Sequence, residues 1–247
     1  MAIPIWMAST RAALTAWPTY PPGPADLRSI RVAGVELPAR ASVALVLVTF
    51  LVLFDYQRTF IPDEVQALGV SPAALRYQAL ERLILFGLVP LLVIVLAFRD
   101  RPERYGLRVG AWRLGLPAAL LGCALMTPVV IAVVSEPSFA AYYARSAASL
   151  PDVLVTNAID LAPSEFILRG FLMFTLFRGI GPVGIIVAQL PFVFSHLGKP
   201  ELELFSTMFG GLAYAWLDWR TGSILWSILP HVYILTLAIS LSAAAVS

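Results

Sequence analysis

The sequence predicts an all-α fold, a polytopic bundle of membrane-spanning helices, and two observations lead to this fold class. First, 59% of the 247 residues are hydrophobic and only 13% are charged, whereas soluble proteins carry about 25% charged residues. Second, the apolar residues form long runs with few charges, of the length that a helix needs to cross a bilayer. The net charge of +2 is too small to indicate a nucleic-acid partner, and no strand pattern or sheet is expected.

Seven segments have the composition of membrane spans, and an eighth pass or a half-span is compatible with the pattern. Short links join them, so we expect one membrane domain that extends from residue 41 to residue 247. The predicted spans are 41–57, 78–98, 114–134, 152–178, 181–197, 200–219 and 223–245.

The first forty residues differ from the rest in composition. The stretch WPTYPPGPADLRS is rich in proline, which interrupts helices. A basic start, an apolar core and a cleavage site do not occur in the order typical of a signal peptide. Residues 1–40 are therefore predicted to form a flexible or surface-lying tail on the cytoplasmic side.

Basic residues are distributed unevenly over the predicted links. Eleven lie in the tail and in the links after the second, fourth and sixth spans, whereas four lie in the other links. Because basic links tend to stay on the cytoplasmic side, we expect a cytoplasmic amino terminus and, with seven spans, an outward carboxyl terminus. The expected location is the plasma membrane of a prokaryotic cell.

Ionisable residues inside the predicted spans are the candidates for function, since each costs a few kcal/mol in lipid unless it is paired or wetted. Glu165 and Arg169, in APSEFILRGFLMF, are four residues apart and share one helix face. An ion pair that only fixes two helices together would explain them equally well. The only two histidines, His196 and His231, also lie in apolar spans, and this combination favours a functional site.

Two kinds of chemistry fit these residue types. Two imidazoles and one carboxylate can bind Zn²⁺ and leave a position for water, so His196, His231 and Glu203 are candidate ligands of one divalent metal such as zinc. Without a metal, a glutamate in an apolar pocket acts as a general base while His and Arg stabilise the oxyanion. Both routes lead to hydrolysis of an amide, and the residues leave the choice open.

Three motifs, in this order, resemble the CPBP family of CAAX prenyl endopeptidases and bacteriocin-processing or immunity membrane proteins. SEFILRGFL is similar to the Glu-Glu pair followed by Arg and Gly, FVFSH is similar to Phe-x-x-x-His, and SILPH ends on the His of His-x-x-x-Asn. The resemblance implies a core over about residues 100–240. It also implies an intramembrane endopeptidase that cuts a membrane-embedded or lipidated peptide or protein, with Glu165, Arg169, His196 and His231 in its site.

Two positions depart from the family pattern. Ser164 stands where the family has its first Glu, the usual water-activating residue, and Leu235 stands where Asn is usual. A turn at Lys199–Pro200 is expected to bring Glu201 or Glu203 close to His196 as a replacement, although helix-start chemistry explains these two acids equally well. The departures leave open a catalytically inactive relative that acts as a membrane binding, immunity or scaffold protein. A transporter is less favoured, because no inverted repeat is visible.

Overall fold

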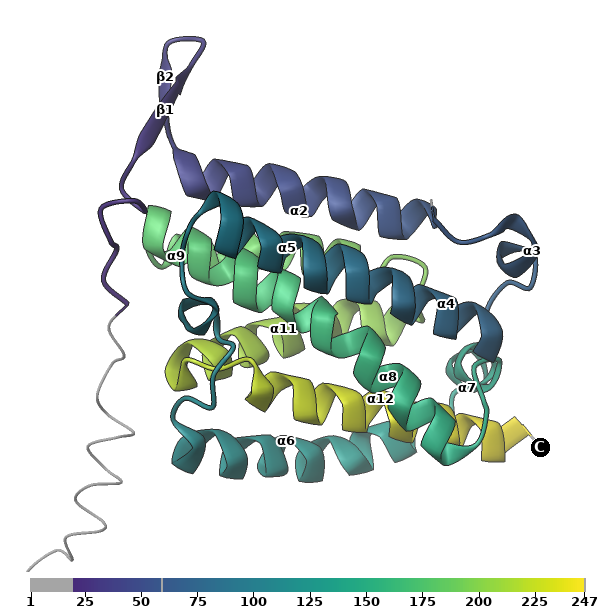
Figure 1. Ribbon diagram of the computed structural model, residues 1–247. Helices are drawn as coiled ribbons and strands as arrows, with labels where there is room; N and C mark the ends of the chain where they lie inside the picture. Colours follow the sequence, from purple (N-terminus) through teal and green to yellow (C-terminus); the bar gives the residue numbers. More distant parts are fainter. Residues whose placement is uncertain (1–19, 59, 247) are drawn as a thin grey trace, which may run out of the picture.

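The computed structural model describes residues 20–58 and 60–246. In this part of the chain it forms a bundle of helices with one two-stranded sheet outside the bundle (Figure 1). Most helices run along a common direction, so the bundle has two ends. One end carries the start of α2 and the end of α9, and the other carries α3, α7 and the carboxyl terminus (Figure 1). The all-α class predicted from the sequence is confirmed.

Four long apolar helices have the length and composition of membrane spans, and they coincide with four of the predicted ones. In the second of these, two π-helical stretches, Leu83–Leu88 and Val93–Ala97, join α4 to α5 and extend it. The elements of this group are α2 (Ala39–Gln57), α4 (Pro72–Arg82) with α5 (Val89–Leu92), α6 (Trp112–Val133) and α12 (Leu225–Val246).

The other three predicted spans are also helical, but they are shorter or more polar. The segment 152–178 is one continuous helix made of α8 (Leu150–Glu165), a π-helical stretch (Phe166–Met173) and α9 (Phe174–Ile180). The segment 181–197 contains α10 (Val183–Phe194), which has only 12 residues, and 200–219 corresponds to α11 (Glu201–Thr221). The number of spans therefore stays a prediction. The links contain α3 (Asp63–Gln66), α7 (Pro137–Ala144) and a 3₁₀ turn (Pro102–Tyr105).

The expectation of no sheet is wrong. Strands β1 (Ser29–Val32) and β2 (Val35–Pro38) form an antiparallel hairpin within the segment predicted as a tail. Its two-residue turn, Ala33–Gly34, has φ values of 50° and 86°, as a type I′ hairpin turn requires. The hairpin is too short to give a strong alternating pattern in the sequence. Residues 1–19 of the predicted tail lie outside the described residues.

The helix from α8 to α9 passes through the centre of the bundle, and its π-helical stretch is buried along its whole length. Two glycines allow the close packing that fixes this centre. A Cβ on Gly170 would lie 2.7 Å from the carbonyl oxygen of Tyr105, and a Cβ on Gly211 would lie 2.7 Å from the ring of Phe192. Gly211 therefore allows α11 to pack closely against α10.

An ion cluster fixes the chain that precedes the hairpin. The buried carboxylate of Asp26 accepts hydrogen bonds from Arg40 at 2.9 Å, from Arg104 at 2.8 Å and from the Gly23 N–H at 2.8 Å. Burial alone would raise the pKa of Asp26, but the Gly23 N–H and the two guanidinium groups outweigh it and lower the pKa to about 2. Residues 23–26 are thereby attached to the end of the bundle where α2 begins.

Candidate active site

Glu165 lies at the centre of a buried polar cluster. It is the last residue of α8 and is only 1% exposed. Its Oε1 accepts a hydrogen bond from Nδ1 of His231 at 2.5 Å, and its Oε2 accepts one from Nη1 of Arg169. The hydroxyl of Ser227 lies 3.4 Å from the same Oε2. Three of the residues singled out in the sequence, Glu165, Arg169 and His231, are thus in direct contact.

Arg169 comes from the π-helical stretch that follows Glu165, and such wide turns often occur at functional sites. Its guanidinium lies over the rings of Phe192, at 4.1 Å from the centroid, and Tyr214, at 5.3 Å. These contacts hold the cation in place without neutralising it. Its Nε and Nη2 have no hydrogen-bond partner among the described residues. Arg169 therefore provides the positive charge that allows the buried carboxylate of Glu165 to remain ionised.

The contacts of His231 determine which nitrogen carries the proton. An ionised carboxylate can only accept, so the Nδ1 that contacts Glu165 must be the N–H donor. The lone pair of the neutral ring is then on Nε2, for which no hydrogen bond to the described residues is present. The ring is also bordered by Tyr214 and Phe192, with centroids 5.7 and 6.4 Å away. His231 is thus fixed with a basic nitrogen on the side away from Glu165.

His196 follows α10. As in His231, its Nδ1 is the hydrogen-bonded nitrogen, but the acceptor is a backbone carbonyl instead of a carboxylate. Its Nδ1 lies 2.8 Å from the carbonyl oxygen of Phe192, which can only accept, so Nε2 again carries the lone pair. The Phe192 ring lies 4.7 Å from the His196 ring and also borders His231. No described hydrogen bond joins His196 to Glu165. The two histidines are neighbours through Phe192 rather than through a shared carboxylate.

A second buried carboxylate, Asp218, was missed by the sequence analysis. It is fully buried in α11, and its Oδ2 accepts a hydrogen bond from the hydroxyl of Ser227 at 2.7 Å. Ser227 therefore lies between the carboxylates of Asp218 and Glu165. The signal was present, because Asp218 falls within the predicted span 200–219. Its position near Arg220 and the end of that span made it resemble an ordinary helix terminus.

Glu201 and Glu203 are the two acids that were expected to replace the missing first Glu near His196. Glu203 accepts hydrogen bonds from the hydroxyl of Tyr143 and, at 2.8 Å, from Nζ of Lys199. Glu201 is exposed at the start of α11. Among the described residues, no hydrogen bond joins either acid to a histidine. Ser164 bonds its own helix, through a 2.7 Å contact of its hydroxyl with the Asp160 carbonyl.

The donor set proposed for zinc does not fit this geometry. Within residues 20–58 and 60–246, no three His, Cys, Asp or Glu side chains are grouped as a metal site would require. Glu203 is bound by Lys199 and Tyr143, and His231 faces Glu165. The set of His196, His231 and Glu203 is therefore not assembled in the described part of the chain.

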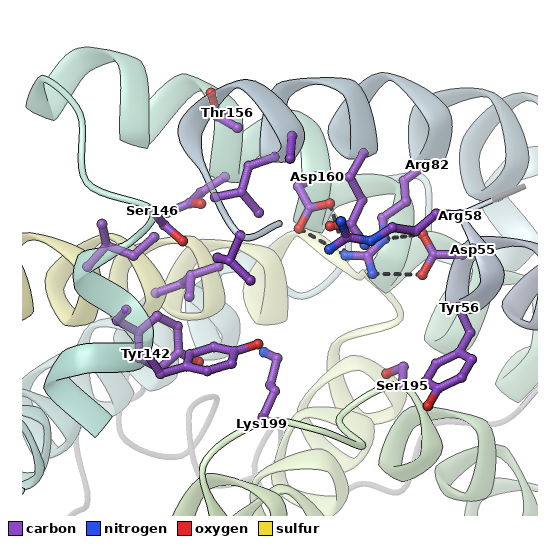
Figure 2. Close-up of a pocket in the computed structure, with 18 of the residues that line it drawn as sticks. Asp55, Tyr56, Arg58, Arg82, Tyr142, Ser146, Thr156, Asp160, Ser195 and Lys199 are labelled. Carbon is purple, nitrogen blue, oxygen red and sulfur yellow. Dashed lines mark hydrogen bonds and ion pairs between the residues drawn. The ribbon is translucent and has the colours of Figure 1, made fainter. Parts of the chain in front are cut away.

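A cavity of about 230 Å³ lies beside the cluster, at the end of the bundle that carries α3 and α7. Figure 2 shows Arg82 between two carboxylates in its wall, with contacts of 2.7 Å to Asp55 and 2.9 Å to Asp160. Several residues that line the cavity are close in the chain to residues of the cluster. They are Ser195 and Leu197 on either side of His196, Leu235 one turn after His231, and Asp160 five residues before Glu165.

Residues 146–236 match a family model described as type II CAAX prenyl endopeptidase Rce1-like. The matched segment begins just before α8 and ends within α12, so it contains the whole polar cluster together with Glu201 and Glu203. No curated protein and no solved structure matches the chain.

Proposed function

Because residues 146–236 match an Rce1-like family model, we propose that this integral membrane protein hydrolyses a peptide bond in a membrane-anchored or prenylated substrate. The family supports a CAAX-type intramembrane protease in general terms. The finer assignment depends on one observation, the 2.5 Å hydrogen bond between His231 and Glu165 in a buried cluster beside a cavity. This pair is the arrangement in which a carboxylate orients an imidazole as a general base.

In the proposed reaction, His231 is the base and Glu165 positions it. Glu165 holds Nδ1–H, so that Nε2 is available to take a proton from water and the resulting imidazolium is stabilised by the carboxylate. Arg169 keeps Glu165 ionised. This division of roles explains why Glu165, which is nearly inaccessible, serves the reaction without contacting the water itself.

In the proposed reaction, His196 orients the water. Its Nε2 carries a lone pair, as Nε2 of His231 does, and accepts a hydrogen bond from the water. A water between the two imidazoles donates one hydrogen to each Nε2 and directs its oxygen at the scissile carbonyl. His231 takes the first proton as the C–O bond forms, and it returns that proton to the amide nitrogen as the C–N bond breaks. The products are a carboxylic acid and an amine, and both histidines regain their starting state.

The cavity is the proposed binding place of the peptide: its lining includes Ser195 and Leu197 on either side of His196, but none of Glu165, Arg169, His196 and His231. Its lining mixes apolar side chains with polar and charged ones, including Asn157, Lys199 and the Arg82 ion cluster, as a site that binds both backbone amides and apolar side chains requires. The proposed substrate therefore enters from the end of the bundle that carries α3 and α7. This route needs neither Glu201 nor Glu203 as the base.

The test is cleavage of peptide reporters by the purified protein in liposomes, followed by mass spectrometry. Reporters with a prenylated Cys near the carboxyl terminus, with an acyl anchor and with no anchor should separate the substrate classes. His231→Asn keeps a donor toward Glu165 but has no second nitrogen, so the rate should fall by about 10²–10⁴ while the protein stays folded. Glu64→Gln, on the exposed face of α3, is the matched control and should keep the parent rate.

A specific observation favours a second candidate, a catalytically inactive relative that binds a membrane partner. The serine in place of the first Glu bonds its own helix, and Leu235, in place of Asn, lines the cavity without a polar group. A parent protein that cleaves none of the anchored reporters, yet retains more of one reporter than protein-free liposomes do, would support this role and contradict the protease.

A further inference from the structure

The β1–β2 hairpin has one apolar face and one polar face. Directly opposed residues of an antiparallel pair lie on the same face, and the register pairs Ile30 with Leu37 and Val32 with Val35. Residues two apart along a strand also share a face, so all four side chains project to one side. Arg31 and Glu36, which are paired in the same register, project to the other. The hairpin is therefore amphipathic.

The apolar face is not covered by the protein. The exposed fractions are 42% for Ile30, 52% for Val32, 59% for Val35 and 36% for Leu37. These are high values for four clustered aliphatic side chains, since a contiguous apolar patch on a folded protein usually marks a contact surface. Figure 1 shows the hairpin standing away from the bundle where α2 begins, at a steep angle to that helix.

Chain connectivity places this face at the membrane boundary. The hairpin ends at Pro38 and α2, a candidate span, begins at Ala39, so no linker separates them. The Ala39 N–H also donates to the Arg28 carbonyl oxygen at 2.8 Å, which closes the base of the hairpin onto the helix. Four residues of strand extend only about 13 Å. The hairpin therefore cannot move far from the level at which α2 enters the bilayer.

The steep angle to α2 makes the hairpin roughly parallel to the membrane plane, because α2 runs along the common direction of the bundle (Figure 1). The outer surface of α2 continues the apolar surface, with Val43 44% and Val46 55% exposed. Arg28 is exposed as well and provides a charge that complements anionic headgroups, whereas the exposed Arg31 lies 3.9 Å from Glu36 on the polar face. Lipid is thus the occupant that both the geometry and the charge favour.

From these observations we infer that the β1–β2 hairpin is an interfacial anchor. Ile30, Val32, Val35 and Leu37 insert at the boundary between headgroups and acyl chains, while Arg31 and Glu36 face water and the anionic headgroup layer. The anchor fixes the depth and rotation of α2 at this end of the bundle. It does not depend on any enzymatic activity.

Site-directed spin labelling tests this inference with adjacent positions on opposite faces. Cys123 is first replaced by Ala, and the full chain carries Val35→Cys or, as its matched control, Glu36→Cys. Each nitroxide-labelled protein is placed in phosphatidylcholine–phosphatidylglycerol vesicles, and its accessibility to oxygen and to a water-soluble nickel chelate is measured. The label at 35 should be reached severalfold more by oxygen than by nickel, and the label at 36 should show the reverse.

Two other results would overturn the inference. Equal, high access of nickel to both labels would place the hairpin in water. Protection of the label at 35 from both reagents would indicate a protein contact, and loss of that protection on dilution in lipid would identify a second copy of the chain as the occupant. If either variant misfolds, Ile30→Cys and Arg31→Cys repeat the comparison on β1. The measurement is repeated in vesicles of phosphatidylcholine alone, which carry no net charge. Insertion of the apolar face should persist in these vesicles, whereas binding by charge should be lost.

Discussion

The hydroxyl of Ser227 donates a hydrogen bond to Oδ2 of Asp218 at 2.7 Å, and both side chains are completely buried. The same hydroxyl lies 3.4 Å from Glu165, so one small polar side chain separates two carboxylates in the bundle interior. Two carboxyl groups so close together in a buried site are costly unless each is paired or hydrogen-bonded. Ser227 and Arg169 therefore determine whether the cluster is stable.

Replacing Ser227 with Ala should destabilise the protein by about 1–3 kcal/mol, because Asp218 Oδ2 would remain buried without its donor. Thermal unfolding in detergent micelles measures this loss. Ser206→Ala is the control, since Ser206 lies on the exposed side of α11, the helix that carries Asp218, and its hydroxyl donates to the Glu203 carbonyl. Equal melting temperatures for the two variants would show that the Asp218 contact contributes nothing.

Replacing Arg169 with Leu should cost about 3–5 kcal/mol, because it leaves the carboxylate of Glu165 buried without a counter-charge. The double variant Arg169→Leu, Glu165→Leu should be more stable than Arg169→Leu alone, since it removes the uncompensated charge. A double-mutant cycle from unfolding midpoints measures this coupling. Strictly additive losses would contradict a tightly coupled pair.

Glu203→Gln should weaken the contact between α7 and α11 without removing the base. Glu203 already accepts from Tyr143 and Lys199, so we expect a lower melting temperature and a cleavage rate within tenfold of the parent. Glu201→Gln, at the exposed start of the same helix, should change neither. A loss of 10²-fold or more with Glu203→Gln, in a protein with unchanged melting, would instead identify Glu203 as the water-activating acid.

The sequence predicted what depends on local pattern. Run length and composition predicted the four long apolar helices, and the spacing of four predicted the contact between Glu165 and Arg169. The family resemblance placed His231 in one site with Glu165, 66 residues away, but not the hydrogen bond between them, because that depends on how distant helices pack. For the same reason the contact of Glu203 with a tyrosine 60 residues away was not predicted. The hairpin was missed because four-residue strands give little periodic signal.

Acid should loosen the attachment of the segment before the hairpin. The pKa of Asp26 is about 2 in the folded protein, below its ordinary value of 3.8, so its ionised form stabilises the fold above about pH 4. That contribution is lost as the pH falls through about 2. Between pH 5 and pH 2, the melting temperature of Asp26→Asn should therefore fall less than that of the parent. Glu64→Gln should follow the parent curve.

The orientation in the membrane can be tested with single cysteines in a chain that carries Cys123→Ala. Arg104→Cys lies at the end of the bundle where α2 begins, and Lys199→Cys lies at the cavity end. In intact cells, an impermeant maleimide should label position 199 and should leave position 104 unlabelled until the cells are opened. Labelling of both positions from outside would contradict the cytoplasmic assignment of the basic links.

The cavity lies at the end of the bundle opposite the hairpin and the arginine-rich links, and this gives the proposed reaction a direction. A substrate that is cut there must present its scissile bond on the face that carries α3 and α7, and its freed polar fragment leaves to the aqueous compartment on that side. The two halves of a cleaved protein would then differ in fate. The anchored half stays in the bilayer, whereas the released half is delivered to one compartment only, so the topology of the fold would decide where the product acts.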